Sequence, residues 1–292
     1  AGDIFTNRSL DGGATWLTSA RRIESDVPGA NVSLDPQIAC SGPNVYVVWF
    51  DDRNGSHDIF FNRSIDHGGT WMQQEVRLDT DILSASSLVP EIAAFGSNVY
   101  VTWYDFRDGP AAVYMNRSED NGLTWLSDDV PISFPVGSAP AGNAWVPRIQ
   151  ADENAVRIVW YDDRDVGTDI YFDYSTDGGI TWLDVDQRLD TSDLGTSGSF
   201  SPQIAAEGND VYVCWHDHRN VGADVYLNRS TDGGATWLDN DVRLSTSAPG
   251  SSFSTGPQID VSFGKVAVIW IDDRNGEQDV YSNVSVDGGA NW

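Results

Sequence analysis

Lysine is nearly absent from this chain of 292 residues. Its 17 basic residues are all arginines except Lys265, and they face 44 Asp and Glu, for a formal net charge of −27 at pH 7. So acidic a surface repels nucleic acid and anionic lipid, and neither is an expected partner. Most aspartates recur at fixed positions of a repeat, so the repeat explains the acidity better than a salty or extracellular habitat, which stays open as the alternative.

Cysteines and long apolar runs are also scarce. Cys40 and Cys214 fall in different expected strands three repeats apart, so we expect two buried thiols and no disulfide. No stretch is long and apolar enough to span a membrane, so membrane insertion is not expected. No signal peptide is visible, and the chain opens at Ala1 in the middle of a repeat, which leads us to expect processing or truncation upstream.

The dominant feature is an octapeptide, Ser-x-Asp-x-Gly-x-x-Trp, that occurs six times at intervals of about 55 residues. Its aspartate can bond the backbone of a turn, its glycines supply positive φ, and its tryptophan provides an apolar anchor. The aspartates of the six copies are Asp11, Asp66, Asp120, Asp177, Asp232 and Asp287.

Between the octapeptides the pattern is that of short strands. Residues 36–40, 45–49, 58–63 and 70–78 predict four strands joined by turns, and no segment carries a helical period. Four antiparallel strands joined by tight turns form one blade of a β-propeller. Of the 12 tryptophans, all except Trp145 end an octapeptide or a second strand, which indicates packing between blades.

The octapeptide resembles the Asp box, or BNR repeat, of the sialidase-like β-propellers. The resemblance implies an all-β protein with four-stranded antiparallel blades and a single propeller domain over residues 1–292. A partial repeat covers 1–16, and full repeats cover 17–71, 72–125, 126–182, 183–237 and 238–292. The resemblance favours six blades, one of them incomplete or split across the termini; the five full repeats leave five blades as the alternative.

A second motif, Trp-x-Asp-x-Arg, recurs five times after the second strands. We expect its arginine to be held between carboxylates across a hairpin. Calcium is the alternative, since Asp52, Asn54 and Asp58 could donate oxygens from one loop, but calcium needs six to eight oxygens and an arginine in the loop opposes it. No other cofactor is expected. The His216-x-His218 pair is interpreted as surface variation and not as a metal site.

The third complete repeat departs most from the pattern. Arg148 replaces a glutamine or glutamate such as Glu91, Arg157 replaces a tyrosine, and Asp173-Tyr174 replaces Asn-Arg. Trp145 replaces a smaller apolar residue at the start of a first strand, and first strands line the central channel of a propeller. The alternative is drift with local charge compensation. The predicted ligand-binding residues are Glu91, Trp145, Arg148, Arg157 and Tyr174.

The resemblance implies that sialidase chemistry would need three arginines from different blades, a Tyr-Glu pair, an aspartate that acts as the catalytic acid, and an Arg-Ile-Pro motif. The nearest match, Val-Pro-Arg-Ile-Gln at 146–150, lacks the second proline, and no Tyr-Glu pair can be assigned, so no catalytic residue is predicted. A fold alone does not license a function.

We therefore favour a non-catalytic, secreted or cell-surface propeller that binds glycan or extracellular protein. The binding face would carry the loops before the first strands, at 138–144, 192–199 and 245–255. One alternative is an exo-sialidase-type glycoside hydrolase with diverged or missing site residues. Another is a structural or adhesive module of a larger extracellular protein.

Overall fold

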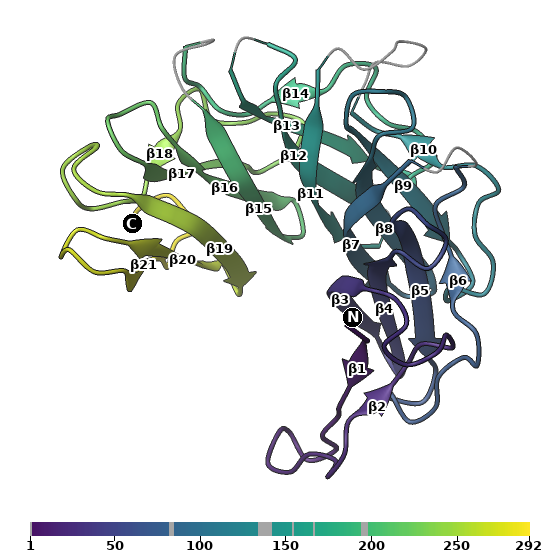
Figure 1. Ribbon diagram of the computed structural model, residues 1–292. Coiled ribbons are helices and arrows are strands. Elements are labelled where there is room, and N and C mark those ends of the chain that lie inside the picture. The colour runs from purple at the N-terminus through teal and green to yellow at the C-terminus, as the bar shows by residue number, and fades with distance from the viewer. Residues whose placement is uncertain (1, 82–84, 134–141, 154, 166, 194–197) are drawn as a thin grey trace. The chain divides into compact units, whose positions relative to one another are not determined.

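The computed structural model describes residues 2–81, 85–133, 142–153, 155–165, 167–193 and 198–292. Throughout these residues the regular structure is β-strand, and neighbouring strands are antiparallel (Figure 1). No helix of the described chain has the length and apolarity needed to cross a bilayer. The chain forms two compact units, Ala1–Ile132 and Ser133–Trp292.

The first unit holds a two-stranded hairpin and two four-stranded sheets, each in chain order. The hairpin is β1 (Phe5–Thr6) and β2 (Arg21–Arg22). The first sheet is β3 (Ser33–Ser41), β4 (Asn44–Asp51), β5 (Asp58–Ser64) and β6 (Val76–Arg77). The second is β7 (Ser87–Phe95), β8 (Asn98–Asp105), β9 (Ala112–Ser118) and β10 (Val130–Pro131).

The second unit holds two four-stranded sheets and one of three strands. The first sheet is β11 (Ala144–Ala151), β12 (Val156–Asp162), β13 (Asp169–Ser175) and β14 (Gln187–Arg188). The second is β15 (Ser199–Glu207), β16 (Asp210–Asp217), β17 (Asp224–Ser230) and β18 (Val242–Arg243). The third is β19 (Ser254–Ser262), β20 (Lys265–Asp272) and β21 (Asp279–Ser285).

The all-β class and the four-stranded antiparallel sheets confirm the predicted strand pattern and are consistent with a propeller. The fourth strand is much shorter than expected, because β6 covers Val76–Arg77 alone. At its predicted beginning the Met72 amide donates to the Arg63 carbonyl at 3.2 Å, and the Asn62 side chain adds two bonds, to the Met72 carbonyl at 3.2 Å and from the Met72 amide at 3.1 Å.

The prediction of two buried thiols is half wrong. Cys214 is buried in β16, whereas Cys40 is exposed on β3, and both are free. Cys40 lies near the end of a first strand whose side chains alternate between half-buried and exposed. Burial of a thiol in apolar surroundings disfavours the thiolate, so the pKa of Cys214 is raised well above its ordinary value.

Each octapeptide folds into a turn organised by its aspartate. Asp66 accepts the hydroxyl of Ser64 at 2.7 Å, and it accepts the amide and hydroxyl of Thr70 at 2.7 and 2.9 Å. The Ser64 hydroxyl in turn accepts the amide of Gly68. These donors favour the ionised carboxylate and lower the pKa of Asp66 to about 2. The same bonds recur in all six octapeptides, with Asn291 in place of the threonine in the last.

The tryptophans join neighbouring sheets within each unit. Trp215, fully buried, packs in one cluster with Val159 and Ile170 of the preceding sheet. Trp237, at the end of an octapeptide, meets the ring of Phe172 edge-on with centroids 4.9 Å apart. These contacts confirm the predicted inter-sheet packing inside the second unit.

The strands of each sheet begin and finish at two opposite ends of the sheet. One end, which we call the turn edge, carries the octapeptide turns between third and fourth strands. The opposite edge, the loop edge, carries the starts of the first strands, the ends of the second strands and the connections between sheets.

Replacing Asp177 by alanine should destabilise the second unit. The variant loses the bonds to the hydroxyls of Ser175 and Thr181 and to the Thr181 amide, all between 2.7 and 2.8 Å. We expect a loss of about 1–3 kcal/mol in the free energy of unfolding, measured by chemical denaturation. Asp184→Ala is the matched control at an exposed position nearby. Equal stability of the two variants would contradict this role of the turn.

Candidate functional site

The arginine of the Trp-x-Asp-x-Arg motif is clamped at the loop edge. Arg164 pairs with Asp162 of its own motif and with Asp186, which directly precedes the fourth strand β14, both at 2.6 Å. Its guanidinium lies 4.2 Å from the ring centroid of Tyr171. Arg53, Arg107 and Arg219 make the same two ion pairs, and all five motif arginines stack on an aromatic ring. The predicted clamp between carboxylates is confirmed in these four repeats.

The three calcium candidates are occupied by protein partners. Asp52 accepts the amide of Val32 at 2.8 Å, and the Asn54 amide nitrogen donates to Asp58 at 2.6 Å. Asn54 thus directs its nitrogen, and not its oxygen, at Asp58. The other oxygen of Asp58 pairs with a guanidinium. Calcium binding at these three residues stays a prediction, because their side chains are engaged with protein partners here.

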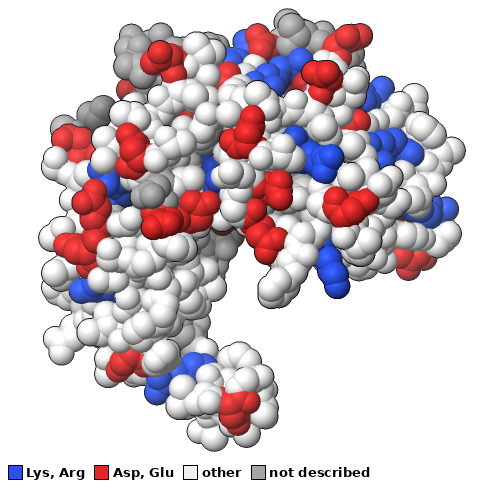
Figure 2. All heavy atoms as spheres, turned by 180° about the vertical axis from the view of Figure 1, so that it is seen from behind, with Lys and Arg blue, Asp and Glu red and all other residues white. Residues whose placement is uncertain are grey.

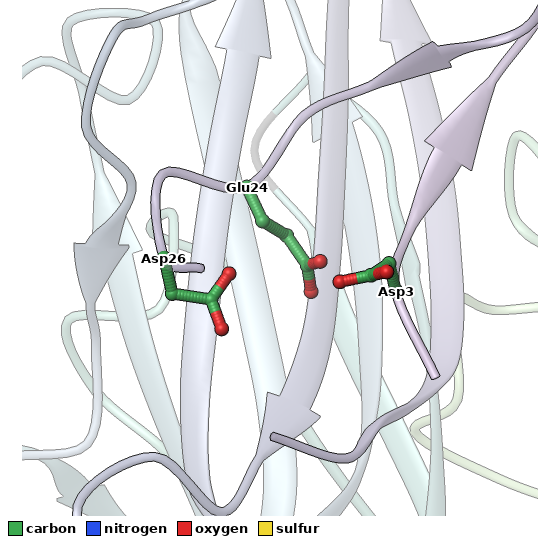
Figure 3. A group of neighbouring side chains, drawn as sticks. All are labelled: Asp3, Glu24 and Asp26. Carbon is green, nitrogen blue, oxygen red and sulfur yellow. The ribbon is translucent and has the colours of Figure 1, made fainter. Parts of the chain in front are cut away.

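Among the residues that the structure describes, two clusters of three carboxylates have the spacing to hold a metal ion, and each already surrounds an arginine. In Figure 3 the carboxylates of Asp3 and Glu24 point toward one another, with Asp26 beside them. Arg22 Nη2 lies 2.8 Å from Asp3, 3.2 Å from Glu24, and also pairs with Asp26. Arg77 does the same for Asp58, Asp79 and Asp81 in the next repeat.

The sheet β7–β10 shows that these groups depend on one another. Where the preceding repeat has Asp58, Arg77 and Asp79, this repeat has Ala112, Pro131 and Ser133. The cation and its carboxylates are lost together, as expected if a buried charge is tolerated only with its partner. We therefore assign these clusters to the scaffold.

Arg157 and Tyr174 are a compensated exchange. In the other complete repeats that carry the pair, a tyrosine on the second strand faces an arginine on the third, as in Tyr46 opposite Arg63. Here Arg157 faces Tyr174, so the two residue types have changed places. Arg63 reaches the octapeptide turn of the next repeat at the Asn121 carbonyl. Arg157 reaches the corresponding turn at the Gly233 carbonyl, 3.1 Å away, from its new position.

This contact gives Arg157 a structural role. Its side chain is 3% exposed and also binds Asp152 and Gln150. It lies at the turn edge, opposite Gln150, whereas Trp145 begins the same hairpin at the loop edge, opposite Tyr161. The structure therefore does not bring Arg157 and Tyr174 together with Trp145.

The exchange predicts an asymmetric double-mutant cycle. Arg157→Tyr alone should cost about 2–4 kcal/mol, because a buried arginine and its bond to the next turn are lost. Adding Tyr174→Arg should restore much of this loss by recreating the usual arrangement. Thermal and chemical denaturation of the single and double variants measures the coupling. Additive losses would contradict the exchange.

Asp173 stands where other repeats have an asparagine, and it is buried. Its Oδ1 accepts the amides of Tyr174 and Leu183, as the asparagine oxygen does elsewhere. Asparagines at this position also donate to backbone carbonyls, as Asn228 does to Leu189 and Leu238, and an ionised carboxylate cannot. Burial, reinforced by the charge of Asp186, raises the pKa of Asp173 to about 7.

Asp173 should therefore make stability depend on pH. The folded state holds its proton up to about pH 7 and the unfolded chain only to about pH 4, so its contribution to the unfolding free energy falls as pH rises between these values. Asp173→Asn should remove this fall and gain on the order of 3 kcal/mol at pH 8. Asn228→Asp should introduce the same fall in the next sheet. Denaturation from pH 4 to 8 tests both, and parallel profiles for wild type and Asp173→Asn would contradict the assignment.

The loop edge of the second unit carries aromatic side chains that contact one another across neighbouring sheets. Trp145 on β11 lies 5.4 Å from Tyr161 on β12, between ring centroids, and Tyr161 lies 5.5 Å from Phe200 of the next sheet. Such separations are typical of attractive aromatic pairs. We call the full set the aromatic row; it comprises Trp145, Tyr161, Phe200, His216, His218 and Phe253.

Two histidines continue the row from Phe200. The Phe200 ring lies 5.7 Å from His216 and 5.8 Å from His218, and His218 lies 6.4 Å from Phe253. Burial, together with the charge of the neighbouring His218, lowers the pKa of His216 to about 4, so its ring is neutral near pH 7. His218 and Phe253 are exposed and the other four residues are half-buried, which leaves the row accessible from solvent.

Only part of this row was expected from the sequence. The sequence pattern singles out Trp145 and the His216-x-His218 pair for separate reasons, and it assigns no ligand-binding role to Tyr161, Phe200 or Phe253. The signal was available, because the residue after each second-strand tryptophan faces the start of the first strand across the hairpin. These facing positions are Leu34 and Phe50, Leu88 and Tyr104, Trp145 and Tyr161, Phe200 and His216, and Thr255 and Ile271.

A bulge in each first strand sets the direction of the residues around it. In β11 the register shifts between Trp145 and Arg148, and Val146 has a φ of 51°. A β-branched residue is strained in this region, and the last repeat places Gly256 there. Half-buried Arg148 donates to the Pro147 carbonyl at 3.3 Å. Glu91 holds the equivalent position in the first unit, so a shared ligand for Glu91 and Arg148 stays a prediction.

No protein-family profile and no curated protein matches the chain. Solved structures do resemble it. An α-L-arabinanase of Penicillium chrysogenum in complex with arabinobiose aligns with a TM-score of 0.56 at 15% identity, over 85% of this chain and 80% of the other. A GH93 α-L-arabinofuranosidase of Fusarium graminearum gives 0.57 at 15% identity, over 86% and 80%.

The NanB sialidase of Streptococcus pneumoniae aligns with a TM-score of 0.54 at 11% identity, over 82% of this chain and 56% of the sialidase. These structures are β-propeller glycoside hydrolases. At such low identity the similarity concerns the fold alone. The chain thus shares the fold of the β-propeller glycoside hydrolases.

Proposed function

We propose that this protein is a secreted or cell-surface Asp-box propeller that binds neutral glycan, without catalysis, at the loop edge of its second unit. The octapeptide turns, each organised by an aspartate, support the Asp-box assignment. Six blades, one of them incomplete or split across the termini, remain our preferred architecture and five the alternative.

The aromatic row is the observation that carries the proposal. Sugar rings present C–H faces that pack on aromatic side chains, and aromatic residues with a few polar groups are typical of small-molecule sites. The row spans three successive sheets of one unit, so it could contact more than one sugar residue. Its histidines can add hydrogen bonds to hydroxyl groups.

The charge distribution favours a neutral ligand. On the face that Figure 2 shows, acidic and basic side chains are interspersed over the described surface. The loop-edge arginines that could grip a carboxylate are clamped by the fold, as Arg164 and Arg219 are by two aspartates each. A sialoside would therefore meet a chain of net charge −27 without the arginines that its carboxylate needs.

The fold of the neighbouring hydrolases favours one second candidate, a glycoside hydrolase. Arabinanase and sialidase are the activities named for proteins of this fold. Arg148 is the arginine that best fits a hydrolase active site, since it is half-buried on a first strand and does not belong to the recurring arginine clamps. Turnover of a fluorogenic arabinoside or sialoside that is lost in Arg148→Ala would establish this candidate over binding alone.

Binding of neutral oligosaccharide should depend on the aromatic row. Titration calorimetry with arabinobiose and with longer neutral oligosaccharides should show saturable binding that Trp145→Ala and Phe253→Ala weaken about tenfold each, as expected for loss of a stacking ring. Phe263→Ala, at a residue that is 91% exposed on another edge, is the matched control. Absence of binding across neutral glycans, or equal weakening by the control, would refute the proposal.

A further inference from the structure

The partial repeat at the start of the first unit differs from the next four repeats at three positions that meet in one pocket; the last repeat shares the small side chain of the first position, as Ser282. A cavity of about 340 Å³ lies between this repeat and the next octapeptide turn. The residues that distinguish it are Thr6, Ala20 and Arg21, together with the recurring Arg8 and the turn glycines Gly68 and Gly69. We infer that this pocket binds an oxyanion, either free or carried by an acidic monosaccharide.

Thr6 creates the space. The equivalent residues of the next four repeats, Phe61, Met115, Phe172 and Leu227, are fully buried. The Phe172 ring packs so tightly on the next turn that a Cβ on Gly234 would lie 2.7 Å from it. At Gly68, the corresponding glycine opposite Thr6, a Cβ would meet Arg8 Cδ at 3.6 Å and Trp71 at 3.9 Å instead. The volume that an aromatic ring fills elsewhere is open here.

Ala20 and Arg21 change the charge of that space. The position of Ala20 carries an acid in the next four repeats, Glu75, Asp129, Asp186 and Asp241. The position of Arg21 carries valine or glutamine, at Val76, Val130, Gln187 and Val242. Each of those acids pairs with the motif arginine of its own repeat, and the partial repeat holds neither the acid nor that arginine. The net change in this space is therefore the positive charge that Arg21 adds.

The two guanidiniums are held in place by backbone oxygens. Arg8 Nη1 donates to the carbonyls of Asp66 and His67 at 3.2 and 3.0 Å, and Arg21 Nη1 donates to that of Gly69 at 2.8 Å. Within the described residues neither arginine forms a salt bridge, unlike the clamped arginines of the loop edges. Their positive charge is thus held in place without a salt bridge. No acid lines the pocket itself, but the Asp66 carboxylate lies beside its wall, since Arg8 Nη1 and Asp66 Oδ2 are each 2.9 Å from the position that a Cβ on Gly69 would take.

These features define the ligand class. Arginine provides paired donors suited to carboxylate, sulfate and phosphate, and Thr6 and Ser19 add hydroxyl donors. The volume exceeds that of a bare oxyanion, so a monosaccharide bearing the anionic group would fit. The site belongs to the first unit and shares no residue with the aromatic row, so either assignment can fail without the other.

Substitutions that restore the residues of the protein's own repeats test the pocket. Calorimetry at low ionic strength should show saturable binding of sulfate and of glucuronate, with glucose as the neutral comparison. Arg21→Val should weaken binding about tenfold and Thr6→Phe, which fills the cavity, should abolish it. Lys265→Ala removes one positive charge from an exposed site in the other unit and should leave binding unchanged.

Tighter binding of glucuronate than of sulfate would identify an acidic sugar as the ligand, and equal binding a free oxyanion. The inference is overturned if neither anion binds saturably, if glucose binds as well as glucuronate, or if Lys265→Ala weakens binding as much as Arg21→Val does. If the thermal transition shows that Thr6→Phe does not fold, two other variants apply the same test. Thr6→Leu fills part of the cavity and Ala20→Asp adds a negative charge to it, and each should weaken anion binding. Unchanged binding in both of these variants would also overturn it.

Discussion

The pairing of arginine with buried carboxylate is the interaction on which the rest of this structure depends. It fixes the loop between second and third strands through residues such as Arg164, and it fills the small acidic clusters around Arg22 and Arg77. Arginine can serve two carboxylates and an aromatic face at once, which lysine cannot do with equal geometry. The scarcity of lysine and the abundance of aspartate follow from this requirement, repeated around the fold.

Repetition also separates structural from functional departures. At Arg157 and Tyr174 two residues change places and the bond to the next turn survives, so the departure leaves the scaffold intact. At Thr6 no large side chain fills the space against the next turn, and Arg21 adds a positive charge beside it, so a charged cavity results. The aromatic row is a third kind of departure, because within the described residues the side chains of Trp145 and Phe253 make ring contacts and no hydrogen bond. Departures from the repeat that no second change offsets in the scaffold are the best candidates for ligand binding.

Much of the fold could be predicted from the sequence, because its determinants are local. The Asp-x-Gly turns, the β-branched second strands and the recurring tryptophans each act within a few residues of their own positions. The short fourth strand could not be foreseen, since it reflects how few residues pair with the third strand, Val76 and Arg77 alone. The exposure of Cys40 was missed for a similar reason, because it reflects what packs on the first strand and not the strand itself.

The candidate sites were harder to predict, because they require register and neighbouring sheets. Trp145 departs from the repeat by its size, but its contact with Tyr161 depends on the pairing of β11 with β12. The contact of Tyr161 with Phe200 depends on the packing of the next sheet. Arg157 is predicted to bind a ligand because it breaks the repeat pattern, whereas its bond to Gly233 joins residues 76 positions apart and leaves no mark in that pattern. Spacing along the chain carries no sign of either contact.

The arginines of the third strands give each unit a direction. Arg8, Arg63 and Arg229 all donate to the octapeptide turn of the following repeat. Each repeat is thus fastened forward, and removal of one turn releases the arginine of its predecessor. In a stack of units coupled only to their neighbours, such contacts make local opening spread from one repeat to the next. Fraying in this protein should therefore be polar, advancing from the C-terminal end of a unit toward its beginning.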